Sequence, residues 1–170
     1  LGSDTFAGIK CANHYYDEAM AGFSIPATEH STMTIWGPEG EHDAVVRWVT
    51  RTLVDRQVPP GMPKLAACVG DSYDIYRFVR MVCASDIREL VKGSGGTLVI
   101  RPDSGDPTEV LTRIFNVFQE CLPAGEITTN SEGFKVLPSY LRLIWGDGIN
   151  RRSMKNILRF VVGLGWSVSN

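Results

Sequence analysis

The sequence predicts an α/β domain in which parallel strands alternate with helices, arranged as part of an irregular (β/α) barrel with one inserted hairpin. Apolar stretches of four to six residues, which suit buried strands, alternate with longer stretches whose apolar side chains recur at helical spacing. Three of the apolar stretches end in an aspartate beside glycine or serine, and a helical stretch follows each of them: Asp71, Asp103 and Asp147. Three such units are too few to close a barrel, so we expect a partial one.

The first half of the chain is predicted to contain an extended segment, two helices and a strand. Residues 21–36 have no helical period and contain a proline, so they form a strand or an extended loop that leads into the next helix. Residues 41–57 have apolar side chains three or four positions apart, the pattern of an amphipathic helix, which a proline-rich stretch ends. A strand over residues 64–69 ends at Gly70, and one helix follows over about residues 73–91.

The clearest strand-to-helix signal lies in the middle of the chain. A glycine-rich connection over residues 92–96, expected to be flexible, leads to the strand Thr97–Ile100, whose β-branched and apolar residues suit burial on both faces. Asp106 is placed to cap a helix over residues 108–121. Proline follows it at the first helical position, and a glutamate stands three residues after the cap.

The remainder of the chain is predicted to form a hairpin, a strand and a helix. The hairpin covers residues 127–137 and turns at residues 130–133, a cluster of turn-forming residues. Residues 140–145 are apolar enough for another strand, and Asn150 is placed to cap a helix over residues 151–162. The hairpin interrupts the alternation of strands and helices and makes the barrel irregular.

Composition and charge indicate an ordinary soluble protein of one domain. The chain has 170 residues, of which 44% are hydrophobic and 21% charged. A formal net charge of −2 provides no attraction toward nucleic acid or an anionic membrane, so neither is expected as a partner. No apolar run approaches the ~20 residues that a bilayer-spanning helix needs, and there is no signal-peptide pattern. The widely spaced cysteines favour reduced thiols and a cytoplasmic location: Cys11, Cys68, Cys83 and Cys121.

The two ends of the chain suggest a fragment. The chain starts at Leu1 rather than at methionine, and residues 166–170 have the pattern of a strand that has just begun. We therefore expect residues 1–170 to be a single-domain fragment of a larger protein.

The three aspartates at the predicted strand ends are the first candidate site. The carboxyl ends of parallel strands lie at one edge of a sheet, where ligands bind in α/β proteins, and neighbouring glycines let a ligand approach the backbone. This predicts a polyol or phosphate site, with a divalent cation between carboxylates and phosphate oxygens. One alternative is that each aspartate only caps the helix that follows. Another, for Arg101 and Asp103, is an ion pair that closes the strand.

His30 is the second candidate, because it lies in a polar run between Glu29 and Ser31. Glu29 or another carboxylate would orient the imidazole, which would then act as a general base, a phosphate carrier or a ligand. The alternative is a structural role. The sequence contains no HExxH, Walker A or GxSxG motif and no GxGxxG after a strand, which argues against the site types that these motifs define.

Five motifs, in order and with similar spacing, resemble those of the nicotinamide phosphoribosyltransferases, in the nicotinate phosphoribosyltransferase-like superfamily. The motifs are Ser3-Asp4-Thr5, Phe23 to Thr32 (FSIPATEHST), Asp71 to Tyr76 (DSYDIY), Ile100 to Gly105 (IRPDSG) and Gly146-Asp147-Gly148. Together they are specific and cover nearly the whole chain, which resembles the central part of such an enzyme.

The resemblance implies an activity. The family joins nicotinamide to the ribose of phosphoribosyl pyrophosphate, which gives nicotinamide mononucleotide and pyrophosphate for NAD salvage, with Mg²⁺ as cofactor. ATP is an optional coupled substrate that acts through a transient phosphohistidine. The enzymes are homodimers whose sites lie at the subunit interface. Residues 1–170 are accordingly expected to be a catalytic-domain fragment of such an enzyme.

The resemblance also implies three catalytic residues. His30 matches the histidine that carries the phosphoryl group, and Asp71 matches an acidic residue linked to it, where a carboxylate would favour the charged imidazole. Asp103 matches a position beside the ribose and the phosphates. No residue is assigned to the metal.

Five further residues are expected to bind substrate. Arg101 matches the arginine near the nicotinamide amide and phosphate groups, and Asp147 would accept hydrogen bonds from the ribose hydroxyls. Ser72 lies in the motif Asp71 to Tyr76, and Gly146 lies beside Asp147. Asp4 matches the aspartate that accepts from the carboxamide of nicotinamide and would repel nicotinate, although it can also be a loop cap.

Two parts of the family pattern are absent from this chain. They are the N-terminal portion, which carries aromatic and basic binding residues, and a glycine-rich phosphate loop after the last strand. We therefore expect that the isolated chain can lack activity. The alternatives are a nicotinate phosphoribosyltransferase, which Asp4 disfavours, and a non-catalytic nucleotide-binding fragment.

Overall fold

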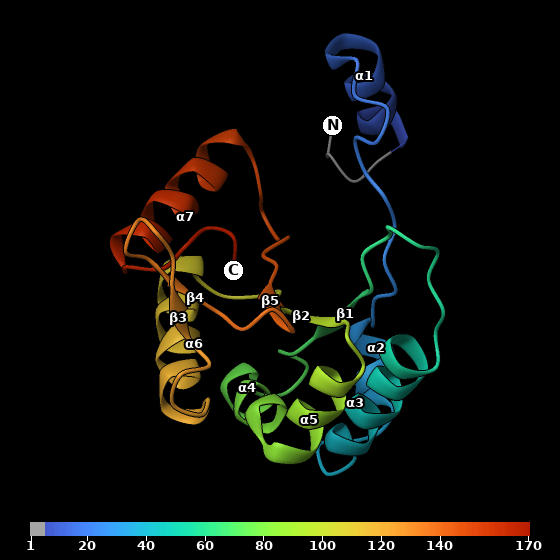
Figure 1. Ribbon diagram of the computed structural model, residues 1–170, viewed down its shortest axis with the longest axis vertical. Helices are drawn as coiled ribbons and strands as arrows, with labels where there is room; N and C mark the ends of the chain where they lie inside the picture. The colour runs from blue at the N-terminus through green and yellow to red at the C-terminus, as the bar shows by residue number, and fades with distance from the viewer. Residues whose placement is uncertain (1–5) are drawn as a thin grey trace.

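The computed structural model describes residues 6–170, which form a mixed α/β domain around a parallel sheet. The strands lie in the order β1 (Leu65–Val69), β2 (Thr97–Arg101) and β5 (Leu141–Leu143). All three are parallel, with Leu65 opposite Thr97 and Leu98 opposite Leu141. Figure 1 shows this sheet in the middle of the molecule. The three predicted strands and their parallel arrangement are therefore confirmed.

Helices pack below the sheet and beside it in the view of Figure 1. Below the strands lie α3 (Glu41–Val49), its π-helical continuation η1 (Thr50–Val54), α4 (Ile75–Cys83) and α5 (Ser85–Gly93). At the left, α6 (Pro107–Cys121) packs against α4, and α7 (Arg151–Gly163) packs against α6. Asp106 and Asn150 cap these last two helices, as predicted, whereas the helix predicted over residues 41–57 ends at Val54.

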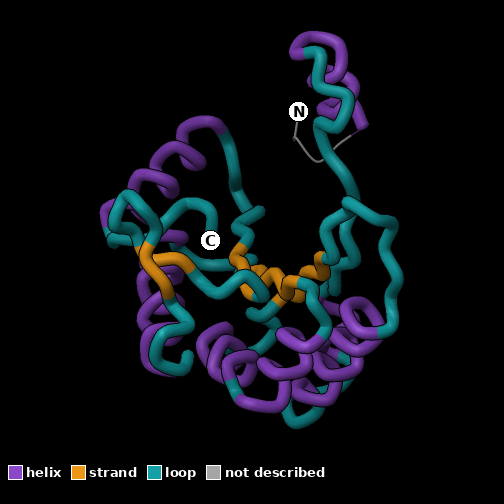
Figure 2. The backbone as a smooth tube through the Cα atoms, in the orientation of Figure 1, coloured by secondary structure: helices purple, strands orange, loops and turns teal. Residues whose placement is uncertain are grey.

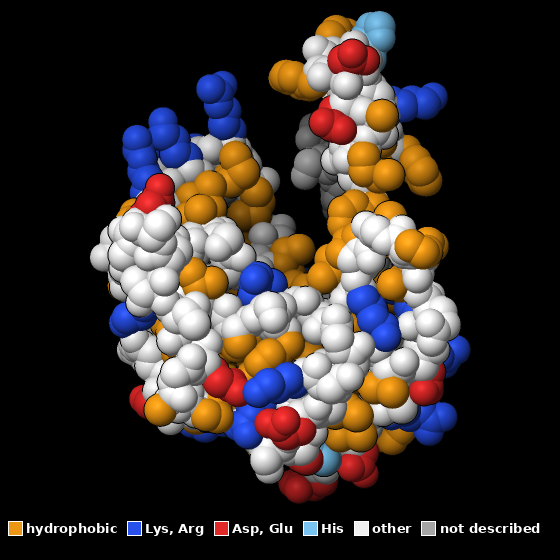
Figure 3. Space-filling view, in the orientation of Figure 1, with side chains coloured by type: hydrophobic (Ala, Val, Ile, Leu, Met, Phe, Trp, Pro, Cys, Tyr) orange, Lys and Arg blue, Asp and Glu red, His pale blue; other side chains and the backbone are white. Residues whose placement is uncertain are grey.

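Two elements lie away from the parallel sheet. β3 (Thr128–Thr129) and β4 (Lys135–Val136) pair antiparallel and form the predicted hairpin, in whose turn the Asn130 side chain accepts from two backbone amides. α1 (Phe6–Tyr16) has no buried residue and projects from the rest of the chain, to which a long loop joins it (Figure 2). Figure 3 shows that the molecule is hollowed between the arm that carries α7 and the arm that carries α1.

The helix predicted over residues 73–91 is instead two helices, because the chain breaks at Ala84. Ala84 has an extended backbone, with φ −63° and ψ 152°, and stands between α4 and α5. The break redirects the chain so that α4 contacts α6 while α5 contacts α3, η1 and β2. Each helix thereby buries its own apolar stripe against a different neighbour. α5 also continues to Gly93, so the connection that was predicted to be flexible is partly helical.

Residues 21–36 are only partly extended, so that prediction is wrong for their second half. Ala27 forms a parallel bridge with Ala67 of β1, which places this part along the edge of the sheet. A short helix, α2 (His30–Thr34), follows. Thr32 closes its first turn, because its Oγ1 accepts from the Glu29 amide at 3.0 Å and donates to the Glu29 carbonyl at 2.7 Å. These local hydrogen bonds satisfy the helix start and favour it over a strand.

The core lies between the sheet and the helices beneath it. At Gly70, a side-chain carbon would lie 2.7 Å from Phe78 Cδ1 and 2.8 Å from Ile75 Cδ1, so glycine lets α4 pack directly against the end of β1. All four cysteines are free, and burial raises the pKa of Cys68 and Cys83 to about 12, which keeps both thiols protonated at neutral pH. Every helix within residues 6–170 is too short or too polar to cross a bilayer.

His42 joins the start of α3 to the start of α5. Its Nε2 lies 2.5 Å from Asp86 Oδ2, and its Nδ1 lies 3.2 Å from Asp43 Oδ1. The hydrogen bond with Asp86, followed by that with Asp43, raises the pKa of His42 above its usual value. A raised folded-state pKa stabilises the protein fully below the unfolded-state pKa, about 6.5 for histidine. This stabilisation is lost as the pH rises through the folded-state pKa.

We therefore expect the free energy of unfolding to decrease as the pH rises from about 6.5 through the folded-state pKa of His42, by the roughly 0.2–1 kcal/mol that exposed ion pairs contribute. Asp86→Asn removes the main partner of His42 and should flatten this part of the profile, measured by urea unfolding at successive pH values. Asp55→Asn changes an exposed carboxylate outside this cluster and should keep the wild-type slope. The same slope in Asp86→Asn and in the wild type would show that the pair contributes nothing.

Candidate functional site

The three parallel strands bring three aspartate-bearing loops to one edge of the sheet. Capping of the next helix, the alternative role for Asp71, Asp103 and Asp147, is wrong in all three loops. The caps stand three residues further along the chain and are Asp74 for α4, Asp106 for α6 and Asn150 for α7. Each of these side chains accepts hydrogen bonds from two backbone amides of its helix. The aspartates that directly follow the strands are therefore not used as caps.

The Asp71 carboxylate connects the loops after β1 and β2 with α2. Its Oδ1 lies 3.0 Å from His30 Nε2, and its Oδ2 accepts from Ser104 Oγ at 2.6 Å and from the Asp103 amide at 3.1 Å. Only 8% of the Asp71 side chain is exposed. Burial by itself would raise the pKa of Asp71, but the hydrogen bonds from Ser104, His30 and the Asp103 amide together lower it below its usual value. Asp71 is therefore an anion at neutral pH.

His30 is the first residue of α2, and only one of its two ring nitrogens has a hydrogen-bond partner among the described residues. Because Nε2 lies beside the Asp71 carboxylate, we assign the ring hydrogen of the neutral imidazole to Nε2, which leaves the lone pair on Nδ1. No hydrogen bond to Nδ1 is present within residues 6–170, and the side chain is 46% exposed. This arrangement suits Nδ1 as a nucleophile, with Asp71 stabilising the positive charge that develops on the ring.

Arg101 ends β2 and lies beside two carboxylates. Its Nη2 is 3.4 Å from Glu29 Oε2, and its Nε is 3.6 Å from Asp103 Oδ1. The ion pair between Arg101 and Asp103 is thus present, although this distance is too long for a hydrogen bond. Arg101 Nε and Ser72 Oγ are buried and have no hydrogen-bond partner among the described residues. Buried polar atoms lose free energy unless they are paired, so these two atoms favour a polar ligand at this edge of the sheet.

Gly146 and Asp147 are less closely joined to the other site residues. They lie in the exposed loop after β5, where Trp145 Nε1 donates to the Asp147 carbonyl at 3.1 Å. Within residues 6–170, no hydrogen bond or ion pair joins the Asp147 carboxylate to the other two aspartates. Asp4 lies outside the described residues. The structure therefore brings together the residues that follow β1 and β2, and places Asp147 at the end of the neighbouring strand.

Two residues of this cluster were missed or left undecided from the sequence. Ser104 was not a candidate, yet its hydroxyl donates to Asp71. For the carboxylate that orients His30 the sequence left open Glu29 or another one; Asp71 lies beside the ring, and Glu29 pairs with Arg101. Both are adjacent in the chain to predicted site residues and lie within the motifs that carry the family resemblance, which is the signal that the sequence offered. Their partners lie on other strands and loops, so only the packing of those elements reveals the contacts.

The described residues do not form a preformed metal centre. Within residues 6–170, no three histidine, cysteine, aspartate or glutamate side chains come together as metal ligands. Asp71 already accepts three hydrogen bonds, which occupy both of its oxygens. Asp103 and Asp147 can each add one carboxylate ligand to a Mg²⁺ ion held mainly by phosphate oxygens. An all-protein Mg²⁺ site does not fit these residues.

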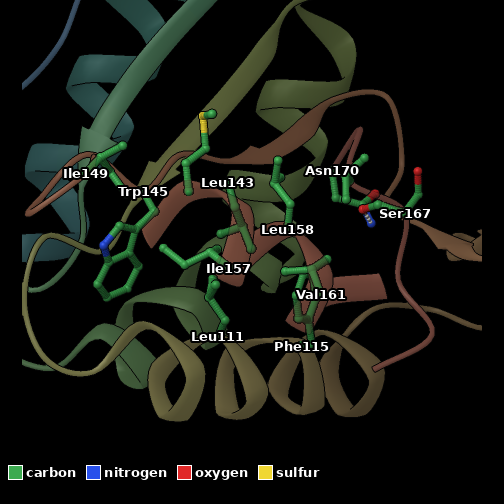
Figure 4. A pocket seen from close by; sticks show the side chains of 12 residues that line it. Leu111, Phe115, Leu143, Trp145, Ile149, Ile157, Leu158, Val161, Ser167 and Asn170 are labelled. Carbon is green, nitrogen blue, oxygen red and sulfur yellow. Dashed lines mark hydrogen bonds between the residues drawn. The ribbon is translucent and has the colours of Figure 1, made fainter. Parts of the chain in front are cut away.

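A separate cavity of about 250 Å³ lies between α6 and α7 (Figure 4). Its walls are mainly apolar and include Leu111, Phe115, Ile157 and Val161. Trp145, which precedes Gly146, also lines it. None of the residues joined by Asp71 reaches this cavity. The cavity is therefore distinct from the polar cluster at the strand ends.

The ends of the parallel strands gather an imidazole–carboxylate pair, an arginine and buried donors that have no partner among the described residues. These features place the protein in the class of α/β domains that bind ligands at the carboxyl ends of their strands. Comparison with known proteins makes the class specific. The chain matches the nicotinate phosphoribosyltransferase (NAPRTase) family over residues 1–169 and belongs to that family. The family predicted from the five motifs is therefore confirmed.

Three relatives named nicotinamide phosphoribosyltransferase are similar to this chain. The protein of Xanthomonas campestris pv. campestris (strain 8004) is 41% identical over 170 residues, which cover 100% of this chain and 34% of the relative. The protein of Acinetobacter baylyi is 28% identical over 187 residues, which cover 100% of this chain and 35% of the relative. The protein of Mycoplasma pneumoniae is 30% identical over 180 residues, which cover 99% of this chain and 35% of the relative. The chain thus spans about a third of the length of these relatives.

Proposed function

We propose that this chain is part of a nicotinamide phosphoribosyltransferase, which acts in NAD salvage. The observation that carries the proposal is the family match over residues 1–169, supported by relatives that bear this name over the full length of the chain. The reaction transfers the phosphoribosyl group of phosphoribosyl pyrophosphate to nicotinamide. Its products are nicotinamide mononucleotide and pyrophosphate.

In the proposed transfer, the ring nitrogen of nicotinamide bonds to C1′ of the ribose while the bond from C1′ to the pyrophosphate oxygen breaks. Pyrophosphate leaves with the bonding electrons, and the positive charge passes to the pyridinium ring. The transition state resembles an oxocarbenium ion, so the protein contributes mainly by positioning the reactants and by stabilising charge. Arg101 would donate to the nicotinamide amide or to phosphate oxygens, with Ser72 as a second donor and Gly146 allowing close approach. Asp103 and Asp147 would accept from the ribose hydroxyls.

ATP coupling is proposed to proceed through His30. Nδ1 would attack the γ-phosphorus of ATP, forming an N–P bond while the P–O bond to ADP breaks. Asp71 would hold the hydrogen on Nε2 and stabilise the charged ring, which fits its distance of 3.0 Å from that atom. Water would later break the N–P bond and release inorganic phosphate. Mg²⁺, when bound, would neutralise phosphate charge.

The assembly that we propose is a cytoplasmic homodimer in which the sheet continues into a (β/α) barrel-like domain. Two observations support the barrel. The strand–aspartate–helix unit repeats along the chain, and β5 pairs on one side only within the described residues. The unpaired side of β5 presents backbone N–H and C=O groups, so β5 is the place where a further strand would add.

The full-length protein, given phosphoribosyl pyrophosphate and Mg²⁺, is expected to form product with nicotinamide and not with nicotinate. The proposed reason is the Asp4 carboxylate, which accepts from a carboxamide and repels a second carboxylate at a cost of several kcal/mol. Asp4→Asn removes this charge. The preference for nicotinamide over nicotinate, measured as a ratio of kcat/KM values, should then fall by at least ~10-fold, or about 1.4 kcal/mol.

Asp55→Asn is the matched control, because it makes the same change at an exposed carboxylate that has no side-chain hydrogen bond among the described residues. It should keep the wild-type ratio. An unchanged ratio in Asp4→Asn would remove Asp4 as the selector. Product from nicotinate alone would favour the nicotinate-using alternative. Mononucleotide binding without any product would favour the non-catalytic alternative.

A further inference from the structure

Two stretches of the chain run alongside each other next to the pair formed by His30 and Asp71. Residues 30–41 comprise α2, the loop after it and the start of α3, and residues 71–77 comprise the loop after β1 and the first turn of α4. The four contacts that join them are His30 with Asp71, Thr34 with Tyr73, Pro38 with Arg77, and Glu41 with Arg77. They are spaced along the whole of both stretches, so they align α2 with the start of α4.

The contacts beyond the His30–Asp71 pair are made to the backbone that follows His30. Tyr73 Oη donates to the carbonyl oxygen of Thr34, the last residue of α2, at 3.1 Å. Arg77 Nη2 donates to the carbonyl oxygen of Pro38. α2 has five residues, and so short a helix has no stability of its own. Its position therefore depends on contacts of this kind.

Glu41 ties Arg77 to the start of α3. The Glu41 side chain is fully buried, and neither carboxylate oxygen has a hydrogen-bond partner among the described residues. Its Oε2 lies 3.8 Å from Arg77 Nη2. Burial raises the pKa of Glu41, and the positive charge of Arg77 opposes that rise. A buried carboxylate without hydrogen bonds is unfavourable, so moving Arg77 away would carry a large penalty and the guanidinium stays over the loop before α3.

We propose that Arg77 and Tyr73 are positioning residues for His30, which they hold beside Asp71 by fixing α2 and the loop after it against the start of α4. Neither side chain binds the imidazole of His30. Both donate to backbone carbonyls that follow His30 in the chain, those of Thr34 and Pro38. Without these contacts α2 would shift, the distance between His30 Nε2 and Asp71 would lengthen, and Nδ1 would lose its orientation. The consequence for catalysis rests on the proposed phosphoryl transfer to His30, whereas the consequence for the geometry does not.

The test compares Arg77→Met with Arg80→Met in the full-length protein. Arg80 lies on the same helix, is exposed and pairs with Glu120, so its loss removes the same charge from α4 without touching α2. We expect the rate of His30 phosphorylation by ATP to fall about tenfold in Arg77→Met, because small misplacements of a reacting group have effects of this size. The KM for nicotinamide should stay within about twofold of wild type. Tyr73→Phe, which removes only a hydroxyl and leaves Glu41 paired, should lower the phosphorylation rate about threefold.

A second measurement needs no catalysis. Diethyl pyrocarbonate modifies unprotonated imidazole nitrogens, and mass spectrometry of the peptides reports each histidine separately. Release of Nε2 from Asp71 offers a second ring nitrogen, so the modification rate of His30 should rise about threefold in Arg77→Met, while that of His14 on α1 should not change. If the modification rate of His30 rises in Arg77→Met but ATP does not phosphorylate the wild-type protein, the positioning role is upheld and ATP coupling is refuted. The inference would be overturned if Arg77→Met and Arg80→Met had equal phosphorylation rates and equal modification rates of His30. It would also be overturned if Arg77→Met changed these rates and Tyr73→Phe changed neither.

Discussion

Replacing His30 with alanine is expected to abolish the transfer of phosphate from ATP to the protein and to lower ATP-dependent turnover by at least ~100-fold. The reason is that Nδ1 of His30 is the proposed nucleophile, and its partner Asp71 pairs with Nε2 at 3.0 Å. Binding of nicotinamide mononucleotide should change by less than about twofold, because the proposed binding groups, Arg101 and Ser72, lie on other elements. Phosphate incorporation, steady-state rates and calorimetric titration with the mononucleotide measure the three quantities.

His14→Ala is the control for this experiment. His14 lies on α1, where its ring contacts Tyr15 and takes no part in the cluster at the strand ends. The His14→Ala variant should therefore show phosphate incorporation and mononucleotide binding at wild-type values. An equal loss of turnover and of mononucleotide binding in His30→Ala would remove His30 from the phosphoryl-transfer role and make it a binding residue.

Phe78→Ala is expected to lower the free energy of unfolding by about 3–5 kcal/mol, the range for truncating a fully buried phenylalanine. Phe78 is fully buried on α4. Its ring packs against Gly70, where a side-chain carbon would lie 2.7 Å from Phe78 Cδ1. Truncation therefore leaves a cavity beside the loop that carries Asp71, and we expect loss of activity to accompany the loss of stability. Urea unfolding followed by tryptophan fluorescence measures the effect.

Phe6→Ala serves as the comparison, because Phe6 on α1 is 89% exposed and its removal leaves no cavity. Its effect on the free energy of unfolding should lie within about 0.5 kcal/mol. A similar loss in both variants would mean that Phe78 contributes no more than an exposed side chain. That result would contradict the packing of α4 against the end of β1.

Local signals in the sequence predicted most elements correctly. The strand Thr97–Ile100 and the helix after it were predicted from residue types and from Asp106 followed by proline, and the structure has both. Asn150 likewise caps α7, and residues 128–136 form the hairpin. These signals act over a few residues, because a cap or a turn satisfies backbone groups of its immediate neighbours.

One wrong prediction concerns a place where neighbours distant in the chain decide the outcome. The break at Ala84 lets α4 pack on α6 while α5 packs on α3, and no proline or glycine stands at the break to mark it. The other wrong prediction, at α2, missed a local signal. Thr32 forms hydrogen bonds with Glu29 that start this helix, whereas Pro26 and the lack of a helical period indicated an extended segment. Helical periodicity alone could not separate one long helix from two short ones.

The sequence by itself determined the alternation of strands and helices, the caps of α6 and α7, and the five motifs that placed the chain in its family, because all of these are recorded in the identity and spacing of residues. Only the tertiary structure decided that Asp71 also accepts from Ser104, that Glu29 pairs with Arg101, and that Nδ1 of His30 has no hydrogen-bond partner within residues 6–170. Hydrogen bonds require donor and acceptor within about 3 Å. For side chains on different strands and loops, that distance is set by how the elements pack, not by their separation in the chain.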